Sequence, residues 1–245
     1  MANPLPFRAR LTYCAHMFKA LTRQHHAEML PLFQQYAPAD GIIIDVGAHA
    51  GQFTKLFSRL VPEGHVYSFE PGKYAYSIAS RVFAFRRLKN VSLYPFGLGD
   101  QSCEKTLRVP IKKSGSVGFG LSHIGDTACA PDRAMREEIV YVTTLDQFIK
   151  THAITRVDFI KVDIEGWEMR FLTGARQTIK KYKPVIFLEI NSVFLKRGDN
   201  TSQQIWDFLT VLGYQMHAIN PDQVTLTPLD GPIDNGDVWC AHKGR

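Results

Sequence analysis

The chain has 245 residues, of which 45% are hydrophobic and 21% are charged, a composition typical of a globular protein with one α/β domain. Its formal net charge is +6, but Lys and Arg are scattered in short pairs, which argues against a nucleic-acid-binding protein. No stretch reaches the roughly 18 apolar residues of a membrane span, and the first residues lack the apolar core of a signal peptide.

The cysteines are widely separated and form no C-x-x-C pair, so the sequence predicts neither a zinc site nor a redox motif. We therefore expect a reduced, cytoplasmic protein, and the sequence leaves its oligomeric state open. The cysteines are Cys14, Cys103, Cys129 and Cys240.

Residues 1–40 are expected to form an N-terminal helical extension that precedes a single globular unit, residues 41–245. Packing of this helix on the domain is the simpler expectation, and a helix that lies on a membrane surface or caps the substrate is the alternative. His25 and His26 lack a partner at a suitable spacing and are expected at the surface. The residues that fit one helical face are Leu11, Cys14, Ala15, Phe18 and Leu21.

From residue 41 onward, strand patterns alternate with helix patterns. This alternation predicts an α/β fold: a mostly parallel sheet with helices on both faces and a ligand site beyond the carboxyl ends of the strands. The expected strands are 42–46, 65–70, 91–97, 157–163, 185–190, 214–219 and 237–242, and the expected helices are 52–60, 73–88, 167–181 and 202–212.

Residues 101–144 interrupt the alternation. Two further strands are expected there, at 106–111 and 138–143, with a Gly- and Ser-containing loop, 114–127, between them. Because long loops in compact domains are often lids or specificity elements, we expect this β insertion, the N-terminal helix and residues 192–201 to shape the ligand pocket.

The most informative stretch is Ile-Ile-Ile-Asp-Val-Gly-Ala-His-Ala-Gly at residues 42–51. It predicts a buried strand, a tight glycine turn after Asp45, and a helix. Such a turn lets a ligand approach the backbone closely and offers free N–H groups from the helix N-terminus. Gly47 and Gly51, with His49 between them, do not complete the G-x-G-x-x-G fingerprint, which favours a cofactor without a pyrophosphate.

Acidic residues follow the strands that come next. Glu70 ends the second strand, where a carboxylate can accept hydrogen bonds from both ribose hydroxyls of a nucleoside. Lys161, Asp163 and Glu165 alternate at the end of a later strand, and period two places all three on one side if the strand continues that far. Because buried charges are costly unless they are paired or used, a Lys161–Asp163 ion pair and a chemical role for Asp163 both stay open.

The next strand ends in Glu189 and Asn191. Asp163, Glu189 and Asn191 would then lie at the carboxyl ends of adjacent strands, in a polar cluster that faces the same crevice as the cofactor.

Together these residues resemble the FkbM family of S-adenosylmethionine-dependent methyltransferases, over about residues 41–191. The stretch from Lys161 to Glu168 is the most specific, and His49 stands where the family usually has Asn. The matching pieces are Asp45-Val-Gly-Ala-His-Ala-Gly51, Phe69-Glu-Pro71, Gly97-Leu-Gly-Asp100, Thr144-Leu-Asp146, Ile160-Lys-Val-Asp-Ile-Glu-Gly-Trp-Glu168, Gly174-Ala175 and Pro184-Val-Ile-Phe-Leu-Glu-Ile190.

The resemblance implies a Rossmann-like class I methyltransferase fold, with a sheet of seven strands whose last strand is antiparallel. It places the methionine part of S-adenosylmethionine against the turn, the ribose at Glu70 and the adenine near the end of strand 91–97. The implied cofactor-binding residues are Asp45, Gly47, Ala48, His49, Gly51, Glu70, Pro71, Gly97, Leu98 and Asp163.

Members of the family are typically O-methyltransferases that act on hydroxyls of sugars, glycolipids or polyketide-type natural products, so the expected partner is a small-molecule or glycan acceptor. A sugar hydroxyl is a poor nucleophile and needs a base or a metal. We expect Asp163 nearest to the acceptor hydroxyl, helped by Glu189, with Glu165 as the other candidate base. Asp163, Glu189 and Asn191 are also hard oxygen donors suited to Mg²⁺ or Ca²⁺, so a divalent cation stays open.

Two other functions stay open. One is a methyltransferase that acts on nucleic acid or protein, which the net charge favours. However, Asp163-Ile-Glu-Gly166 stands where an amino-methylating enzyme would have an Asn-Pro-Pro-Tyr-like motif. The other is a non-catalytic relative that binds only a cofactor or a partner, although an abandoned site gains nothing from buried charge.

Overall fold

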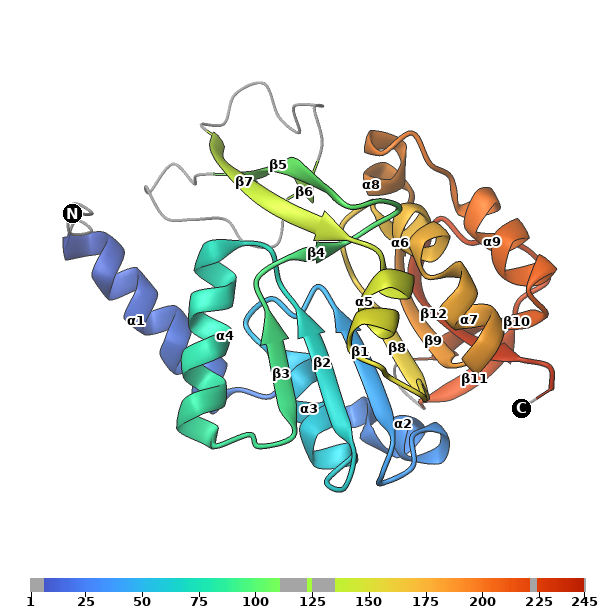
Figure 1. Ribbon diagram of the computed structural model, residues 1–245, viewed down its shortest axis with the longest axis horizontal. Coiled ribbons are helices and arrows are strands. Elements are labelled where there is room, and N and C mark those ends of the chain that lie inside the picture. Colours follow the sequence, from blue (N-terminus) through green and yellow to red (C-terminus); the bar gives the residue numbers. More distant parts are fainter. Residues whose placement is uncertain (1–6, 111–122, 125–134, 221–223, 245) are drawn as a thin grey trace.

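A computed structural model describes residues 7–110, 123–124, 135–220 and 224–244 of the chain (Figure 1). Its centre is an eight-stranded sheet, which confirms the predicted α/β class. The order across the sheet is β11 (Thr225–Pro228), β10 (Tyr214–Asn220), β12 (Asn235–His242), β9 (Val185–Asn191), β8 (Phe159–Val162), β1 (Ile42–Val46), β2 (His65–Phe69) and β3 (Val91–Tyr94).

The strands from β9 to β3 run parallel, whereas β12, β10 and β11 each run antiparallel to their neighbours. The sheet has one strand more than the seven expected, because residues 225–228 pair with β10 at its edge. The antiparallel return of β12 brings its first residues to the carboxyl ends of the parallel strands.

Successive residues of the central strands pack against different helices, as the period of a strand requires. Ile43 of β1 and Phe159 of β8 lie in a cluster with α2 (Leu30–Tyr36) and α3 (Gln52–Leu60). Ile44 and Ile160, their neighbours in the chain, lie in a second cluster on the opposite face. That face is covered by α5 (Leu145–Thr151), α6 (Glu168–Gly174), α7 (Arg176–Tyr182) and α9 (Ser202–Val211).

The helix expected at 167–181 is in fact two helices, α6 and α7, which meet at Ala175. At the junction Gly174 lies against the backbone of Gly99, and a Cβ on Gly174 would come within 1.9 Å of the Gly99 carbonyl oxygen. The close approach of two backbones explains why the chain changes direction at a glycine here.

The described residues between 97 and 143 build a smaller second sheet, which confirms the predicted β insertion. Its strands, in order, are β4 (Gly97–Leu98), β7 (Met135–Thr143), β5 (Cys103–Pro110) and β6 (His123–Ile124). This sheet lies over the carboxyl ends of β1, β2 and β3 (Figure 1). Most of the loop expected at 114–127 lies outside the described residues.

The chain before β1 begins with α1 (Phe7–Thr22), which packs along α4 (Lys73–Arg86) at one edge of the molecule (Figure 1). A 3-10 turn, η1 (Ala27–Met29), then leads into α2. Within the described ranges, no helix combines the length and the apolar character needed to cross a membrane.

Candidate functional site

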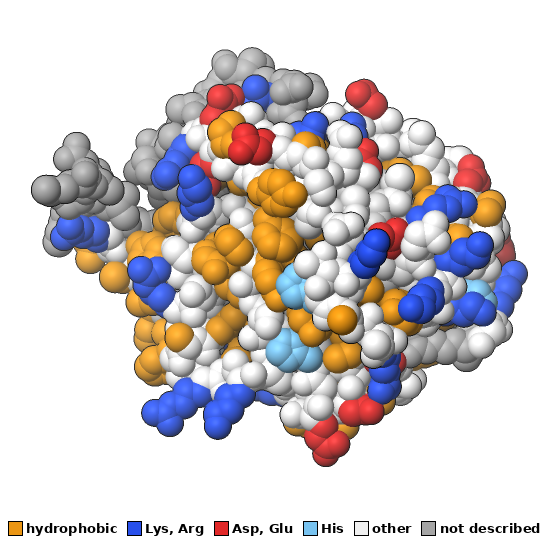
Figure 2. Space-filling model, viewed as in Figure 1, with side chains coloured by type: hydrophobic (Ala, Val, Ile, Leu, Met, Phe, Trp, Pro, Cys, Tyr) orange, Lys and Arg blue, Asp and Glu red, His pale blue; other side chains and the backbone are white. Residues whose placement is uncertain are grey.

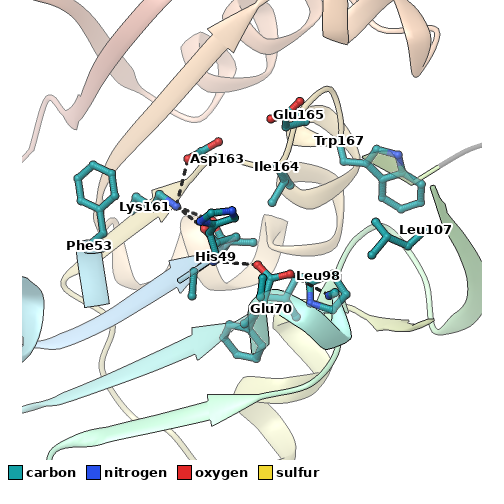
Figure 3. Close-up of a pocket in the computed structure, with 18 of the residues that line it drawn as sticks. His49, Phe53, Glu70, Leu98, Leu107, Lys161, Asp163, Ile164, Glu165 and Trp167 are labelled. Carbon is teal, nitrogen blue, oxygen red and sulfur yellow. Dashed lines mark hydrogen bonds and ion pairs between the residues drawn. The ribbon is translucent and has the colours of Figure 1, made fainter. Parts of the chain in front are cut away.

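A pocket of about 330 Å³ opens at the carboxyl edge of the large sheet, beneath the second sheet (Figure 3). Ten of the predicted site residues line it, although they come from five separate parts of the chain. They are Gly47, Ala48, His49, Glu70, Pro71, Gly97, Leu98, Asp163, Glu165 and Glu189. Asp45, Gly51 and Asn191 do not line this pocket.

The turn after β1 is shaped by close contact with the neighbouring strand. Gly47 has a φ of +76°, and a Cβ there would come within 1.9 Å of the Asp163 carbonyl oxygen. The backbone N–H groups of Gly47 and Ala48 donate to the Phe69 carbonyl, at 3.1 and 2.9 Å. These two N–H groups are therefore occupied by the end of β2, and the free N–H groups expected from the N-terminus of the following helix are not among them.

His49 links the turn to Glu70. Its backbone adopts a φ of +50°, a left-handed conformation in which Asn, Asp and His are the commonest residues after glycine. A His in place of the family's Asn therefore keeps the backbone geometry. The His49 N–H donates to Oε2 of Glu70 at 2.8 Å, and burial lowers the pKa of the His49 ring.

Glu70 is held by backbone donors at both of its oxygens. Besides the bond from His49, the N–H of Gly72 donates to Oε1 at 2.8 Å. Burial raises the pKa of the Glu70 carboxyl to about 7, although both N–H groups and the charge of Lys161 pull it down. The carboxyl is therefore fixed in position, and it changes between its protonated and ionised forms near neutral pH.

Asp45 lies behind the pocket wall, which corrects the expectation that it contacts a cofactor. Its side chain is fully buried and accepts a hydrogen bond from the Thr54 hydroxyl at 2.6 Å. Its other carboxylate oxygen lies 3.4 Å from Nζ of Lys161, its direct neighbour across β1 and β8. Lys161 Nζ also donates to the carbonyls of Val46 and Gly47, so this ion pair fixes the start of the turn.

Asp163 and Glu189 form a carboxyl pair at the end of β8 and β9. Burial raises the pKa of Asp163, but the charge of Lys161, 3.5 Å away, and a hydrogen bond from Glu189 outweigh it, so the net pKa is lowered. The Glu189 side chain is exposed toward the pocket, yet the protein around its carboxyl and the charge of Asp163 raise its pKa to about 8. At neutral pH Asp163 is therefore ionised and Glu189 holds the proton that joins the pair.

A third acid beside this pair was not predicted. Asp237 of β12 stands opposite Glu189 in the register of the sheet, and burial together with the charge of Asp163 raises its pKa to about 6. The signal was present in the sequence, because Asp237 begins the last expected strand. Only an antiparallel placement of that strand brings the residue to the carboxyl edge.

Glu165 lies apart from the pair, on a turn (Figure 3). β8 ends at Val162, so the strand does not continue far enough to align Glu165 with Lys161 and Asp163. Glu165 has a φ of +52°, and Gly166 follows at +101°. Burial and the charges of Asp163 and Glu189 raise the pKa of Glu165 to about 8.

Asn191 does not act as a metal ligand in this arrangement, which corrects its place among the metal candidates. Its side-chain oxygen accepts from the backbone N–H groups of Val193 and Phe194, and so caps the N-terminus of α8 (Ser192–Arg197). The described residues contain no group of three or more His, Cys, Asp or Glu side chains arranged to hold a metal ion. The donor set expected from Asp163, Glu189 and Asn191 is therefore not assembled.

His26 belongs to the pocket, whereas the sequence placed it at the surface. Its ring stacks on Phe53 with centroids 4.4 Å apart, and both residues line the pocket. Burial lowers the pKa of His26, and the charges of Lys161 and Asp163 act on its ring. No spacing in the sequence signals this position, because the contact arises where the segment after α1 folds back onto α3.

The side of the pocket formed by the second sheet combines apolar side chains with one ion pair, in which Nε of Arg136 lies 3.2 Å from Oε1 of Glu138. The apolar side chains of Leu98, Leu107 and Trp167 lie on the side of Glu70 away from Lys161, and Ile164 lies between Asp163 and Trp167 (Figure 3). A flat, uncharged group would contact these apolar side chains, while its polar attachments face Glu70.

Comparison with known proteins places this arrangement among methyltransferases. The family model described as Methyltransferase FkbM domain matches residues 45–216. Methyltransferase 1 from Beauveria bassiana (strain ARSEF 2860) is 26% identical over 147 residues, which cover 56% of this chain and 59% of that protein. The chain thus matches less than two thirds of the length of this relative.

Two solved structures share the fold. The methyltransferase FkbM from Methylobacillus flagellatus KT superimposes with a TM-score of 0.51 at 14% identity, covering 94% of this chain and 59% of that chain. The O-methyltransferase from Bacillus cereus, solved in complex with SAH, also gives a TM-score of 0.51 at 14% identity and covers 99% of this chain and 94% of that chain.

Proposed function

The chain belongs to the FkbM methyltransferase family, and from this premise we propose that it transfers a methyl group from S-adenosylmethionine to a hydroxyl of a sugar, glycolipid or polyketide-type natural product. The observation that carries the proposal is the Asp163–Glu189 carboxyl pair, which lies in one pocket with Glu70 and the 47–49 turn. A nucleoside site and a proton acceptor thus share one cavity.

The pocket fits such a donor in size and in the order of its groups. Its volume of about 330 Å³ is within the range of small-molecule sites. The apolar side chains of Leu98, Leu107 and Ile164 would contact the adenine, and Glu70 would accept from the ribose hydroxyls. The methionine part would lie against the 47–49 turn, close to Lys161.

When bound, S-adenosylmethionine supplies an electrophilic methyl group on a sulfonium. The task of the protein is then to align the acceptor oxygen and to remove its proton. Asp163 alone is a weak base, because Lys161 and Glu189 lower its pKa. Glu189, with a pKa of about 8, matches the working pH better and would take the hydroxyl proton once it has lost its own.

The experiment is a transfer assay with S-adenosylmethionine labelled in its methyl group and a panel of hydroxylated glycans, glycolipids and polyketides, with RNA and protein included as alternative acceptors. We expect label to enter at least one acceptor as an ether that is stable to mild base. Label found only in nucleic acid or in protein amines would overturn the proposed acceptor class. The Glu189→Gln variant should bind the donor but transfer its methyl group at least about 100-fold more slowly.

A further inference from the structure

The two helices at one edge of the molecule form a surface of uniform charge. α1 packs on α4 through Tyr13, whose hydroxyl lies 3.1 Å from that of Ser77 and accepts from Arg81 at 2.7 Å. Nearer its end, α1 is tied to α4 by a hydrogen bond from Arg86 to the Leu21 carbonyl. Two segments far apart in the sequence therefore present one continuous face.

This face contains Lys and Arg but no acid. No Asp or Glu occurs before Glu28 or between Pro71 and Gly99, which are the segments that contain α1 and α4. Without the cations of these segments, the chain would hold fewer Lys and Arg than Asp and Glu. The charges that look scattered in the sequence are thus gathered by the fold, and those exposed here are Arg10, Lys19, Arg23, Lys73, Arg81, Arg86, Arg87 and Lys89.

Large apolar side chains are also exposed on both helices. Leu11 and Phe18 are two helical turns apart on α1, and their side chains are 56% and 67% exposed. Phe85 is 74% exposed and lies one turn beyond Arg81, on the side of α4 that contacts α1. Figure 2 shows hydrophobic side chains with Lys and Arg around them along this edge.

We propose that the α1–α4 face, defined by Leu11, Phe18, Phe85 and the cations around them, docks the protein on the surface of an anionic lipid bilayer. A helix that exposes apolar side chains between cations matches the two layers of a membrane interface, because the apolar groups enter the acyl boundary while the cations meet lipid phosphates. The charge complementarity selects an anionic bilayer over a neutral one.

A nucleic acid would use the cations but not the apolar side chains. Contacts with phosphates account for most of the affinity of a protein for nucleic acid, and stacking on bases needs aromatic rings that lie along a groove. Phe18 and Phe85 are instead exposed on two separate helices, and neither lines the pocket. Binding to a bilayer should therefore depend on the apolar side chains, whereas binding to a nucleic acid should not.

The surface adjoins the pocket. The hydroxyl of Tyr74, a residue that lines the pocket, lies 3.2 Å from Nδ1 of His16 on α1. Docking through α1 and α4 would therefore hold the pocket mouth near the lipid headgroups. The docking proposal does not depend on methyl transfer, because its test involves neither donor nor acceptor.

The test is cosedimentation of the full chain with two kinds of vesicle: phosphatidylcholine alone, and equal parts of phosphatidylcholine and phosphatidylglycerol. We expect binding to the mixed vesicles that weakens as salt is added, and little binding to phosphatidylcholine alone. A Phe18→Ser/Phe85→Ser variant should partition about tenfold or more weakly. The matched control is Val211→Ser on α9, which removes a side chain that is 75% exposed away from this face and should change nothing.

Charge reversal supplies the second arm. Lys19→Glu/Lys89→Glu should lower partitioning by about fivefold or more for each cation removed, whereas Lys150→Glu/Lys180→Glu, on α5 and α7, should leave it unchanged. Failure to bind mixed vesicles would overturn the proposal. Equal vesicle binding of the wild type and the Phe18→Ser/Phe85→Ser variant would also overturn it. A third contrary result is a protein that binds no vesicles but shifts single-stranded RNA in a gel, with the shift lost on charge reversal.

Discussion

Nζ of Lys161 lies 3.5 Å from Oδ2 of Asp163, and only 1% of the Lys161 side chain is exposed whereas 36% of Asp163 is. The lysine thus fixes the acid from inside the protein and leaves part of its carboxylate open to the pocket. Because Lys161 also pairs with the fully buried Asp45, one cation joins the core of the sheet to the site.

Replacement of Lys161 should destabilise the protein strongly. Lys161→Met leaves Asp45 and Asp163 without their cation, and removal of one partner from a buried ion pair costs about 3–5 kcal/mol. Urea denaturation measures the loss in the free energy of unfolding. Lys150→Met, at an exposed position, is the control and should change it by less than about 0.5 kcal/mol. A loss below about 1 kcal/mol for Lys161→Met would show that the ion pair is not structural.

The rate of methyl transfer should rise with pH. Glu189 must be ionised to accept a proton, and its pKa is raised to about 8, so kcat/KM should climb through that pH and then level. A profile of kcat/KM against pH with an accepted substrate measures this rise. The Glu189→Gln variant should lack this rise in kcat/KM. The Glu63→Gln variant, in which an exposed acid elsewhere is replaced, should keep it. A profile that is flat through this range in the wild type would rule Glu189 out as the base.

Affinity for the methyl donor should fall as the pH drops. A ribose hydroxyl donates to the ionised form of Glu70, whose pKa is about 7, so protonation below that pH competes with binding. Affinity should fall about tenfold for each pH unit well below 7. Calorimetric titrations of S-adenosylhomocysteine across this range measure the slope. Glu70→Gln should bind more weakly and without the slope, and an unchanged slope in that variant would assign it to another group.

Gly47 should be intolerant of any side chain. Gly47→Ala adds a Cβ within 1.9 Å of the Asp163 carbonyl oxygen at a φ of +76°, so the turn must move away from β8. We expect a loss of at least about 2 kcal/mol in the free energy of unfolding. The matched control is Gly231→Ala, where a Cβ meets nothing within 4 Å and no loss is expected. Equal stability of the two variants would contradict this description of the turn.

The positions of the main site residues could be predicted because they depend on local patterns. Apolar runs that end in Glu70, Asp163 and Glu189 mark strand ends, and parallel strands bring such ends to one edge. The sequence also contains a signal for the cap at Asn191, because Asn is a common residue at the N-cap of a helix. The prediction of Asn191 as a metal ligand rested only on its place at the end of a strand, whereas its side chain caps the helix that follows.

The remaining features depend on register and on contacts between distant segments. Asp45 is a direct neighbour of Lys161 only because β1 and β8 pair in one register, which no local pattern fixes. His26 enters the pocket because it stacks on Phe53 of α3. The cations of α1 and α4 form one surface only after the two helices pack together.

Calorimetric titration of the wild-type protein with S-adenosylmethionine shows most directly whether this pocket holds the methyl donor. The titration is done at a pH high enough that Glu70 is ionised. We expect one donor molecule to bind per chain in the micromolar range, S-adenosylhomocysteine to bind comparably, and Glu70→Gln to bind clearly more weakly. Absence of binding to a folded wild-type protein, or equal affinity in Glu70→Gln, would contradict the claim that this pocket holds the methyl donor.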